Sequence, residues 1–231
     1  MWPVMETLTL PRPDAVIFDF DGVIVDTEPL HYKAFQEVLE PLGIGFPWQE
    51  YVDTYMGFDD RDAFLEAFHA HGKDLDDRRL KQLVASKSAI FLDIIKKGVR
   101  AYPGTVSLVT SLDASGVPLA ISSGALRSDI LPILDILGIT RCFLHVVSAD
   151  DVRKSKPDPE CYELAYQRLK ETHPLLVSTP DRCLVIEDTP AGIRSAKLAG
   201  LSVLAVTNSY GGKQLTEADH LTDSLENVRI S

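Results

Sequence analysis

Two aspartates, Asp19 and Asp21, stand one residue apart directly after the apolar run Ala15-Val16-Ile17-Phe18. Side chains two positions apart on a strand point to the same face, so both carboxylates can aim at one point where a strand gives way to a loop. Such a pair suits a metal ion and a phosphoryl group better than it suits an apolar core. Asp-x-Asp-Gly also occurs in calcium loops and in plain turns, so the rest of the chain has to decide between these interpretations.

Three further segments carry polar groups that fit the same chemistry: Ile121-Ser122-Ser123-Gly124, Lys154-Ser155-Lys156-Pro157 and Ile186-Glu187-Asp188-Thr189. Phosphoryl transfer requires a nucleophile, an acid in line with the leaving group, and positive charge around the equatorial oxygens. We expect Asp19 to be the nucleophile, because a carboxylate can form an aspartyl-phosphate. Asp21 then protonates the leaving oxygen and afterwards activates water. Like charges this close in a dry site push their two pKa values apart, as the two roles require.

A metal ion is expected beside these carboxylates, because Asp188 adds a third one. A hard cation such as Mg²⁺ prefers oxygen ligands and retains several waters. Without it, each pair of like charges about 4 Å apart would cost about 4 kcal/mol at an effective dielectric of 20. The candidate ligands are Asp19, Asp21 and Asp188. Glu187 either binds the metal through water, orients a ligand, or is a plain loop charge.

The phosphate group needs its own donors. Ser122 and Ser123 follow an apolar run and precede a helical pattern. A hydroxyl with the amides of a helix start holds phosphate oxygens well. Ser123 is equally suited to cap that helix. Lys156 precedes a proline, so its backbone is biased to an extended form from which the ammonium can reach phosphate and Asp19. Lys154 competes for this role.

The elements that position these groups are five β-rich apolar runs, separated from the second onward by helical patterns: Ala15–Phe20, Pro118–Ser122, Leu144–Ser148, Cys183–Ile186 and Ser202–Val206. Continuous apolar strands alternating with helices predict an α/β fold whose parallel sheet is covered on both faces. Ser122, Asp188 and Asn208 lie at or just after the carboxyl ends of such runs. Open α/β sheets bind their ligands at that edge.

The interval from Thr27 to about Gly98 differs, because it contains no convincing strand. Helical spacing of apolar residues predicts three helices, over Pro29–Leu42, Asp59–Ala70 and Asp76–Lys97. We therefore expect a helical domain, residues 28–98, inserted into a core domain of residues 1–27 and 99–231. It is either a cap over the strand ends that excludes water or a bundle that only packs on the sheet.

Composition narrows the partners. The 231 residues carry a formal net charge of −11, which argues against nucleic acid and anionic membranes. A phosphorylated substrate remains compatible, because a bound cation reverses the sign of one local site. The three cysteines are far apart and odd in number, as in reduced thiols of a cytoplasmic protein. No signal peptide and no apolar run of about 20 residues is expected, and we expect a monomer.

Together the four segments resemble the four motifs of the haloacid dehalogenase-like (HAD) phosphohydrolase superfamily, in order and at suitable distances. The stretch from Asp19 to His31 is similar to the branch that holds β-phosphoglucomutase and many sugar-phosphate phosphatases. The resemblance implies a Rossmann-like three-layer core with a helical cap inserted after the first strand. It also implies a Mg²⁺ ion held by the first Asp, the backbone carbonyl of the second and the later Asp. The residues matching the motifs are Asp19, Asp21, Ser122, Lys156, Glu187 and Asp188.

The resemblance leaves several activities open. The favoured one is a phosphatase acting on a small phosphorylated metabolite, of the sugar phosphate or phosphoglycolate type, because dehalogenases and phosphonate-cleaving relatives lack an aspartate at the place of Asp21. A phosphosugar mutase is the first alternative, since His31 matches a histidine on its cap side. A regulatory module that accepts a phosphoryl group or binds Mg²⁺ without catalysis is the second. The long insertion and Asp21 fit that module poorly.

The segment around Arg61 separates the mutase from the phosphatase. The mutase carries an arginine a few residues after a glycine that matches Gly57, whereas here Asp59 and Asp60 come first and Arg61 is displaced by one place. One residue turns a helical side chain by about 100°, and the acidic pair would repel a phosphate. We expect His31 and Arg61 to influence which substrate is accepted.

Overall fold

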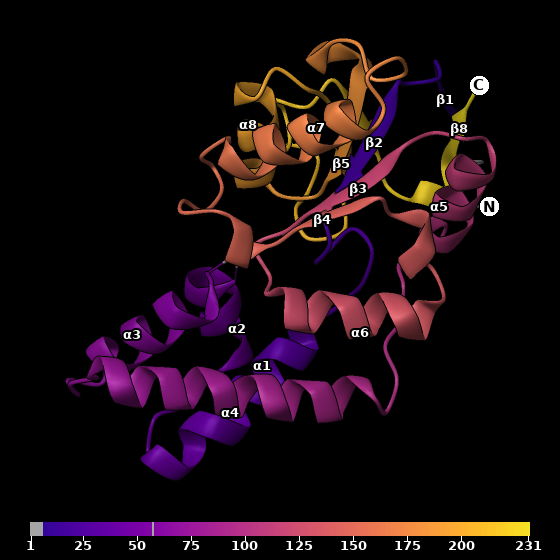
Figure 1. The fold of residues 1–231 in the computed structure, drawn as a ribbon. Helices are drawn as coiled ribbons and strands as arrows, with labels where there is room; N and C mark the ends of the chain where they lie inside the picture. The colour runs from indigo at the N-terminus through magenta and orange to yellow at the C-terminus, as the bar shows by residue number, and fades with distance from the viewer. Residues whose placement is uncertain (1–6, 57) are drawn as a thin grey trace. The chain divides into compact units, whose positions relative to one another are not determined.

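The structure is a computed structural model that describes residues 7–56 and 58–231, and its chain forms two compact units (Figure 1). The core unit consists of the described part of Met1–Asp26 together with Arg100–Ser231. The inserted unit is Thr27–Val99. Two neighbouring segments of the core unit, around Val25 and Ala101, flank the insertion and pair with each other in an antiparallel bridge.

The core unit is built on a six-stranded parallel sheet with the order β4-β3-β2-β5-β6-β7. Its strands are β2 (Ala15–Phe18), β3 (Leu119–Ser122), β4 (His145–Val147), β5 (Cys183–Glu187), β6 (Ser202–Val206) and β7 (His220–Thr222). Phe18 pairs with Ile121 on one side and with Ile186 on the other. The carboxyl ends of β2, β3 and β5 are therefore level, which brings Asp19, Ser122 and Glu187 to one edge.

The five predicted strands are present, and the parallel α/β prediction is confirmed. The sixth strand, β7, was not predicted, because two of its three residues are exposed at the sheet edge and the strand gives no continuous apolar run. A separate parallel pair of β1 (Leu8–Leu10) and β8 (Val228–Ile230) was also missed, since strands this short carry little periodicity.

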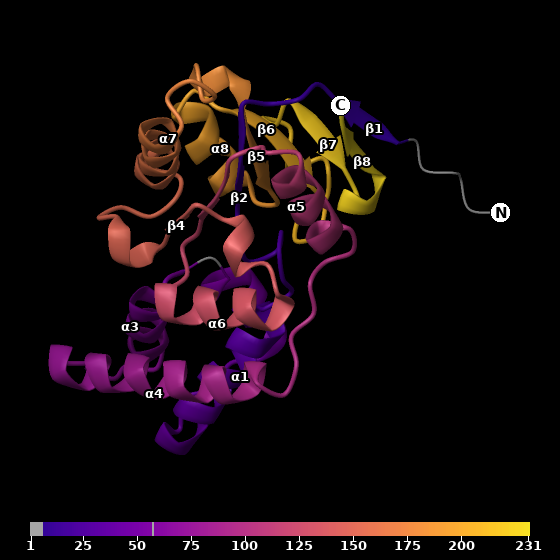
Figure 2. The ribbon, with the colours of Figure 1, turned by 45° about the vertical axis from the view of Figure 1, so that its right-hand side comes forward.

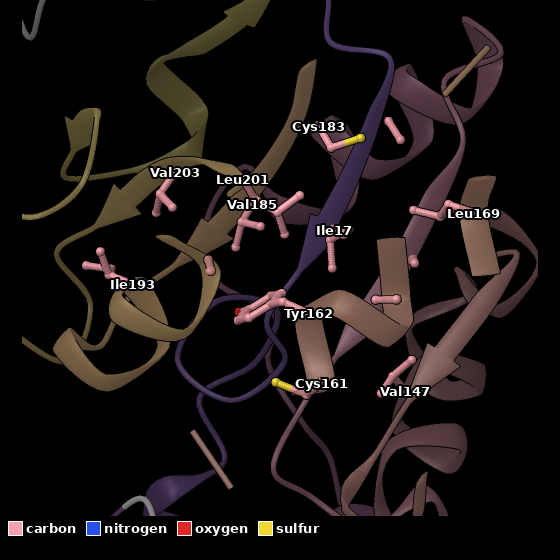
Figure 3. Packing of buried hydrophobic residues seen from close by; sticks show 14 of the residues in the cluster. Ile17, Val147, Cys161, Tyr162, Leu169, Cys183, Val185, Ile193, Leu201 and Val203 are labelled. Carbon is pink, nitrogen blue, oxygen red and sulfur yellow. The ribbon is translucent and has the colours of Figure 1, made fainter. Parts of the chain in front are cut away.

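Helices cover both faces of the sheet. They are α5 (Thr105–Ala114), α6 (Arg127–Leu137), α7 (Glu160–Thr172) and α8 (Pro190–Leu198), with single 3-10 turns at Thr140–Cys142, Ala149–Asp151, Pro180–Arg182 and Leu225–Asn227. In Figure 2, α7 and α8 lie on one face of the sheet and α5 on the other. Alternate strand residues such as Ile17, Val185 and Val203 meet α7 and α8 in one buried apolar cluster (Figure 3). This is a Rossmann-like three-layer core.

The regular elements among the described residues of the inserted unit are all helical. It contains α1 (Glu28–Leu39), a 3-10 turn (Glu40–Leu42), the short α2 (Trp48–Glu50), a π-helical turn (Tyr51–Tyr55), α3 (Asp60–Ala70) and α4 (Asp77–Ile95). The side chains of Asp59 and Asp76 accept hydrogen bonds from the amides of Asp62 and Arg79, which starts the last two helices. The three predicted helices are present, whereas α2 and the π-helical turn were not predicted.

The inserted unit has an apolar core of its own, centred on Phe35, Leu39, Phe64 and Leu80. The side chains of this cluster come from α1, α3 and α4 and from the segment between α1 and α3. Across residues 7–56 and 58–231, the structure has no helix whose length and apolar character would let it span a membrane.

Candidate active site

The loop after β2 is a tight reversal that places Asp19 against Asp188. The Phe20 carbonyl accepts the Ile24 amide at 2.8 Å, and the Gly22 amide donates to the Val25 carbonyl at 2.9 Å. Gly22 has φ +81°, and a Cβ added there would lie 1.9 Å from Asp188 Oδ2. The residue at this position must therefore be glycine both for its backbone and for the close approach of Asp188.

Asn208 holds the same loop from the end of β6. Its side-chain amide donates to the Gly22 carbonyl at 2.6 Å. The sequence placed Asn208 at a strand end but gave it no role, because nothing local indicates that an amide there reaches a residue 186 positions earlier.

Asp19, Glu187 and Asp188 form a buried acidic cluster in which one carboxylate oxygen of each lies within 4.8 Å of the others. Burial raises the pKa of Asp19 to about 8, with Lys156 opposing the shift and Glu187 and Asp21 adding to it. Burial also raises the pKa of Asp188 well above its ordinary value, and Glu187 and Asp19 add to that shift, which the nearby Ser209 hydroxyl only partly offsets. Neither buried oxygen of Asp188 has a partner with hydrogen-bond geometry among the described residues.

Lys156 is the cation of this cluster. Its ammonium donates to Asp19 Oδ1 at 2.7 Å, to Glu187 Oε1 at 2.8 Å and to the Ser122 carbonyl at 3.2 Å. Burial alone would lower the pKa of Lys156, but Asp19 and Glu187 hold it well above its ordinary value. Lys154 instead is exposed and pairs with Asp158 at 3.1 Å. The structure therefore brings Lys156, not Lys154, to Asp19.

Glu187 has both oxygens engaged. Oε1 accepts from Lys156 at 2.8 Å and from the Tyr162 hydroxyl at 3.0 Å. Oε2 accepts from the amides of Asp188 and Thr189 at 2.8 and 2.9 Å and from the Thr189 hydroxyl at 3.1 Å. Burial opposes ionisation, but Lys156 and these amides lower the pKa of Glu187 below its ordinary value. Glu187 is thus a fixed charge that orders its neighbours.

The two serines after β3 differ in their surroundings. Ser122 is fully buried, and no described residue forms a hydrogen bond with its Oγ. Ser123 Oγ accepts the Ala125 amide at 2.9 Å, while α6 begins only at Arg127 with Leu126 as its N-cap. The interpretation of Ser123 as the cap of that helix is therefore wrong.

A divalent cation fits this edge of the sheet. The site contains four carboxyl groups, those of Asp19, Asp21, Glu187 and Asp188. Lys156 donates hydrogen bonds to two of them, Asp19 and Glu187, and supplies one positive charge. The buried oxygens of Asp188 are the ones left without a partner, whereas those of Glu187 are taken. Oxygen donors of this kind suit Mg²⁺. The residues that could hold such an ion are therefore Asp19 and Asp188, and Asp21 is half-buried.

A second polar cluster lies within the inserted unit. Lys87 is fully buried, with Nζ 2.7 Å from Asp60 Oδ1 and 2.7 Å from His31 Nδ1. The His31 ring stacks on Phe91 with centroids 4.1 Å apart. Asp60 Oδ2 is buried and has no hydrogen-bond partner among the described residues. Arg61 is exposed, so the structure does not bring it into this cluster, and Gly57 lies outside the described residues.

We expect Lys87→Met to lower the free energy of unfolding of the inserted unit by about 3 kcal/mol, because it leaves the Asp60 carboxylate buried without its cation. The double variant Lys87→Met with Asp60→Leu should recover most of that loss, since an apolar pair of similar volume carries no desolvation penalty. Urea unfolding of the full chain measures both. A double variant less stable than the single one would contradict this account.

Both the sequence and the fold match known proteins. The family described as haloacid dehalogenase-like hydrolase matches residues 16–206. The chain is 31% identical over 211 residues to a phosphorylated carbohydrates phosphatase of Thermotoga maritima, covering 89% of this chain and 91% of that protein. It is 28% identical over 228 residues to hexitol phosphatase A of Escherichia coli, covering 95% of each.

Solved structures share the fold. The CbbY protein of Rhodobacter sphaeroides, solved in complex with phosphate, matches with a TM-score of 0.81 and 25% identity, covering 92% of this chain and 95% of that one. A β-phosphoglucomutase of Clostridium difficile has the same fold at a TM-score of 0.81 and 22% identity, covering 94% of this chain and 93% of that one.

Proposed function

Because the chain belongs to the haloacid dehalogenase-like hydrolase family, we propose that it is a Mg²⁺-dependent phosphatase of a small phosphorylated carbohydrate that works through an aspartyl-phosphate. The observation that carries the proposal is the environment of Asp19. Its carboxylate is buried at the end of β2, with Lys156 at 2.7 Å and the unpartnered oxygens of Asp188 in the same cluster. That arrangement combines a nucleophile, a fixed positive charge and free oxygen ligands at one point.

The proposed reaction has two steps. In the first, an Asp19 oxygen attacks phosphorus, the ester bond breaks, and Asp21 gives its proton to the departing sugar oxygen. In the second, Asp21 takes a proton from water as that water attacks phosphorus, which releases inorganic phosphate and restores the Asp19 carboxylate. Asp21 thus ends each cycle protonated, as it began.

The other residues hold charge and oxygen atoms in place. Lys156 places its ammonium beside Asp19, where negative charge accumulates on the transferring group. Ser122 has a buried hydroxyl that is available to a phosphoryl oxygen, and Ser123 lies next to it. Asp19 and Asp188, with the backbone carbonyl of Asp21, would hold a Mg²⁺ ion. When bound, that ion supplies the positive charge that lets an anionic ester approach three carboxylates.

The relatives favour phosphatase over mutase. The two curated relatives described above are named as phosphatases of a phosphorylated carbohydrate and a hexitol. Within the inserted unit, Lys87 lies between His31 and Asp60, so its ammonium is already engaged by a carboxylate. We propose that the inserted unit serves as the cap that selects the ester, and that the protein is a cytoplasmic monomer.

Phosphate release from a panel of phosphomonoesters, with Mg²⁺ and with a chelator, tests this function. We expect Mg²⁺-dependent turnover, fastest with a phosphorylated sugar or sugar alcohol. Interconversion of two sugar phosphates without phosphate release would indicate the mutase instead. Stable phosphorylation of the protein without turnover would indicate the regulatory module.

The acidic cluster predicts how stability depends on pH and on metal. The pKa of Asp19 is raised from 3.8 to about 8, so the folded chain binds this proton more tightly than the unfolded chain does. The contribution of Asp19 to the free energy of unfolding is complete below about pH 4 and is lost as the pH rises through about 8. We expect the metal-free protein to unfold at a lower temperature at pH 8.5 than at pH 6.5.

Mg²⁺ should reverse this loss, because it competes with protons for the same oxygens. At a hundred times its dissociation constant it should add about 2.7 kcal/mol to the free energy of unfolding. The stabilisation at a fixed Mg²⁺ concentration should be larger at pH 8.5, and it should disappear in Asp188→Asn. Thermal unfolding at both pH values measures this, and an equal effect of Mg²⁺ in the variant would refute the assignment.

A further inference from the structure

Tyr162 joins the apolar core to the acidic cluster. It is fully buried on α7, and its ring packs in the apolar cluster between the sheet and helices α7 and α8 (Figure 3). Its hydroxyl is the polar end of an otherwise apolar contact surface. That hydroxyl donates to Glu187 Oε1 at 3.0 Å and accepts from Lys156 Nζ at 3.0 Å. Phenylalanine would fill nearly the same volume, so the hydroxyl itself needs an explanation.

The hydrogen bonds around Lys156 explain why a hydroxyl is present at this position. An ammonium has three protons to donate. Four acceptors lie within 3.2 Å of Nζ: Asp19 Oδ1, Ser122 O, Tyr162 Oη and Glu187 Oε1. The single proton of the Tyr162 hydroxyl points to Glu187, so a lone pair of its oxygen faces Lys156. The ammonium also lies over the tyrosine ring, 4.6 Å from its centroid.

These acceptors belong to two kinds of partner. Tyr162 Oη, Glu187 Oε1 and the Ser122 carbonyl belong to buried residues that the proposed reaction leaves chemically unchanged. Asp19 changes from a carboxylate to an acyl phosphate and back in every cycle of that reaction. When Asp19 is phosphorylated, the negative charge moves from its carboxylate to the phosphoryl group, while Tyr162 and Glu187 still hold the ammonium.

We propose that Tyr162 is a positioning residue, whose hydroxyl keeps the Lys156 ammonium in place while Asp19 is converted to the acyl phosphate and back. This role rests on the phosphatase function proposed above. Tyr162 touches neither the ester nor the metal in this account, and it acts only through Lys156 and Glu187. A role in packing alone would be served equally by phenylalanine.

Tyr162→Phe tests the hydroxyl, and Tyr166→Phe is its matched control. Tyr166 lies one turn further along α7 and is only half-buried, and its hydroxyl donates to the Ser178 carbonyl at 3.1 Å and accepts from Lys170 at 3.2 Å. We expect kcat to fall about tenfold in Tyr162→Phe. A tenfold change corresponds to 1.4 kcal/mol, which is about the contribution of one hydrogen bond to a charged group. Tyr166→Phe should stay within about twofold of the wild type.

A double-mutant cycle separates positioning from packing. In a Lys156→Met background, assayed at high enzyme concentration, Tyr162→Phe should change the residual rate by less than about twofold, because the lysine it positions is gone. The same tenfold loss in both backgrounds would show a general structural effect and overturn the proposal. An unchanged kcat in Tyr162→Phe alone would overturn it as well. A wild type without turnover of any phosphomonoester would overturn the phosphatase function and this role together.

Discussion

Asp19→Asn should abolish phosphate release, with turnover falling by at least about 10⁴-fold, the scale typical of losing a covalent nucleophile. The amide that replaces the carboxylate has the same shape but is a poor nucleophile and cannot form an acyl phosphate. The oxygen of that amide would still accept a hydrogen bond from Lys156, so the local geometry should be kept. Steady-state release from the best ester of the panel, with saturating Mg²⁺, measures the effect.

Two controls make this loss interpretable. Asp93→Asn is the same substitution at an exposed carboxylate, paired with Lys96 on α4, and it should leave turnover within about twofold of the wild type. The metal-free Asp19→Asn protein should unfold at no lower temperature than the wild type at pH 9, because it removes a carboxyl that burial keeps from ionising until about pH 8. Turnover above about 1% of the wild type would exclude Asp19 as the nucleophile.

Gly192→Ala should reduce turnover by at least about a hundredfold, although the substitution favours helix formation. A Cβ at this position of α8 would lie 1.6 Å from Glu187 Oε1, so the carboxylate has to move. Glu187 holds Lys156 with one oxygen and the amides of Asp188 and Thr189 with the other. Its displacement therefore disturbs the cation and the proposed metal ligand together, and a misplacement of about 1 Å can cost catalysis about 10²-fold.

Ala191→Gly is the matched control on the preceding residue, which is exposed. It weakens the helix by up to about 1 kcal/mol without touching Glu187, whereas Gly192→Ala changes helix propensity in the opposite direction. We expect near wild-type turnover in Ala191→Gly and a large loss in Gly192→Ala. If turnover instead followed helix propensity, rising in Gly192→Ala and falling in Ala191→Gly, the close approach of Glu187 would be irrelevant to activity.

The strands that carry the candidate site were predictable because each is a continuous apolar run that ends in polar residues. Ala15–Phe18 and Cys183–Glu187 are buried along their whole length, so hydrophobicity alone marks them. Two of the three residues of His220–Thr222 are exposed, and this edge strand is identified by its pairing with β6 and not by its composition. Edge strands of this length carry no local signal.

The buried lysine Lys87 was not predicted, although its position on the apolar face of α4 can be read from the sequence. On α4 the buried positions include Leu80, Leu83, Phe91 and Ile94, and Lys87 occupies the place between them in the same apolar stripe. A lysine on the buried face of a helix needs an anionic partner, which here is Asp60. The spacing was visible, but the partner lies 27 residues away and only the fold identifies it.

Tyr162, Asn208 and the two close-approach glycines could not be predicted from one sequence. Tyr162 contacts Glu187, which lies 25 residues away in the chain, and Asn208 contacts Gly22, which lies 186 residues away. Gly22 and Gly192 are required by the carboxylates that lie against them, which is a fact of packing and leaves no pattern in neighbouring residues.

The bridge between Val25 and Ala101 bears on how such a chain can change over generations. The Asp26 amide also meets the Arg100 carbonyl, at 3.4 Å, and Thr105 donates to the Val23 carbonyl at 3.1 Å. The two ends of the insertion are thus joined within the core unit itself. The entropy cost of closing a loop grows only slowly with its length, so the number of residues between 27 and 99 can change at little cost. Such a segment can be lengthened, shortened or replaced while the sheet keeps its register, so the proposed cap can diverge in sequence without displacing the residues at the strand ends.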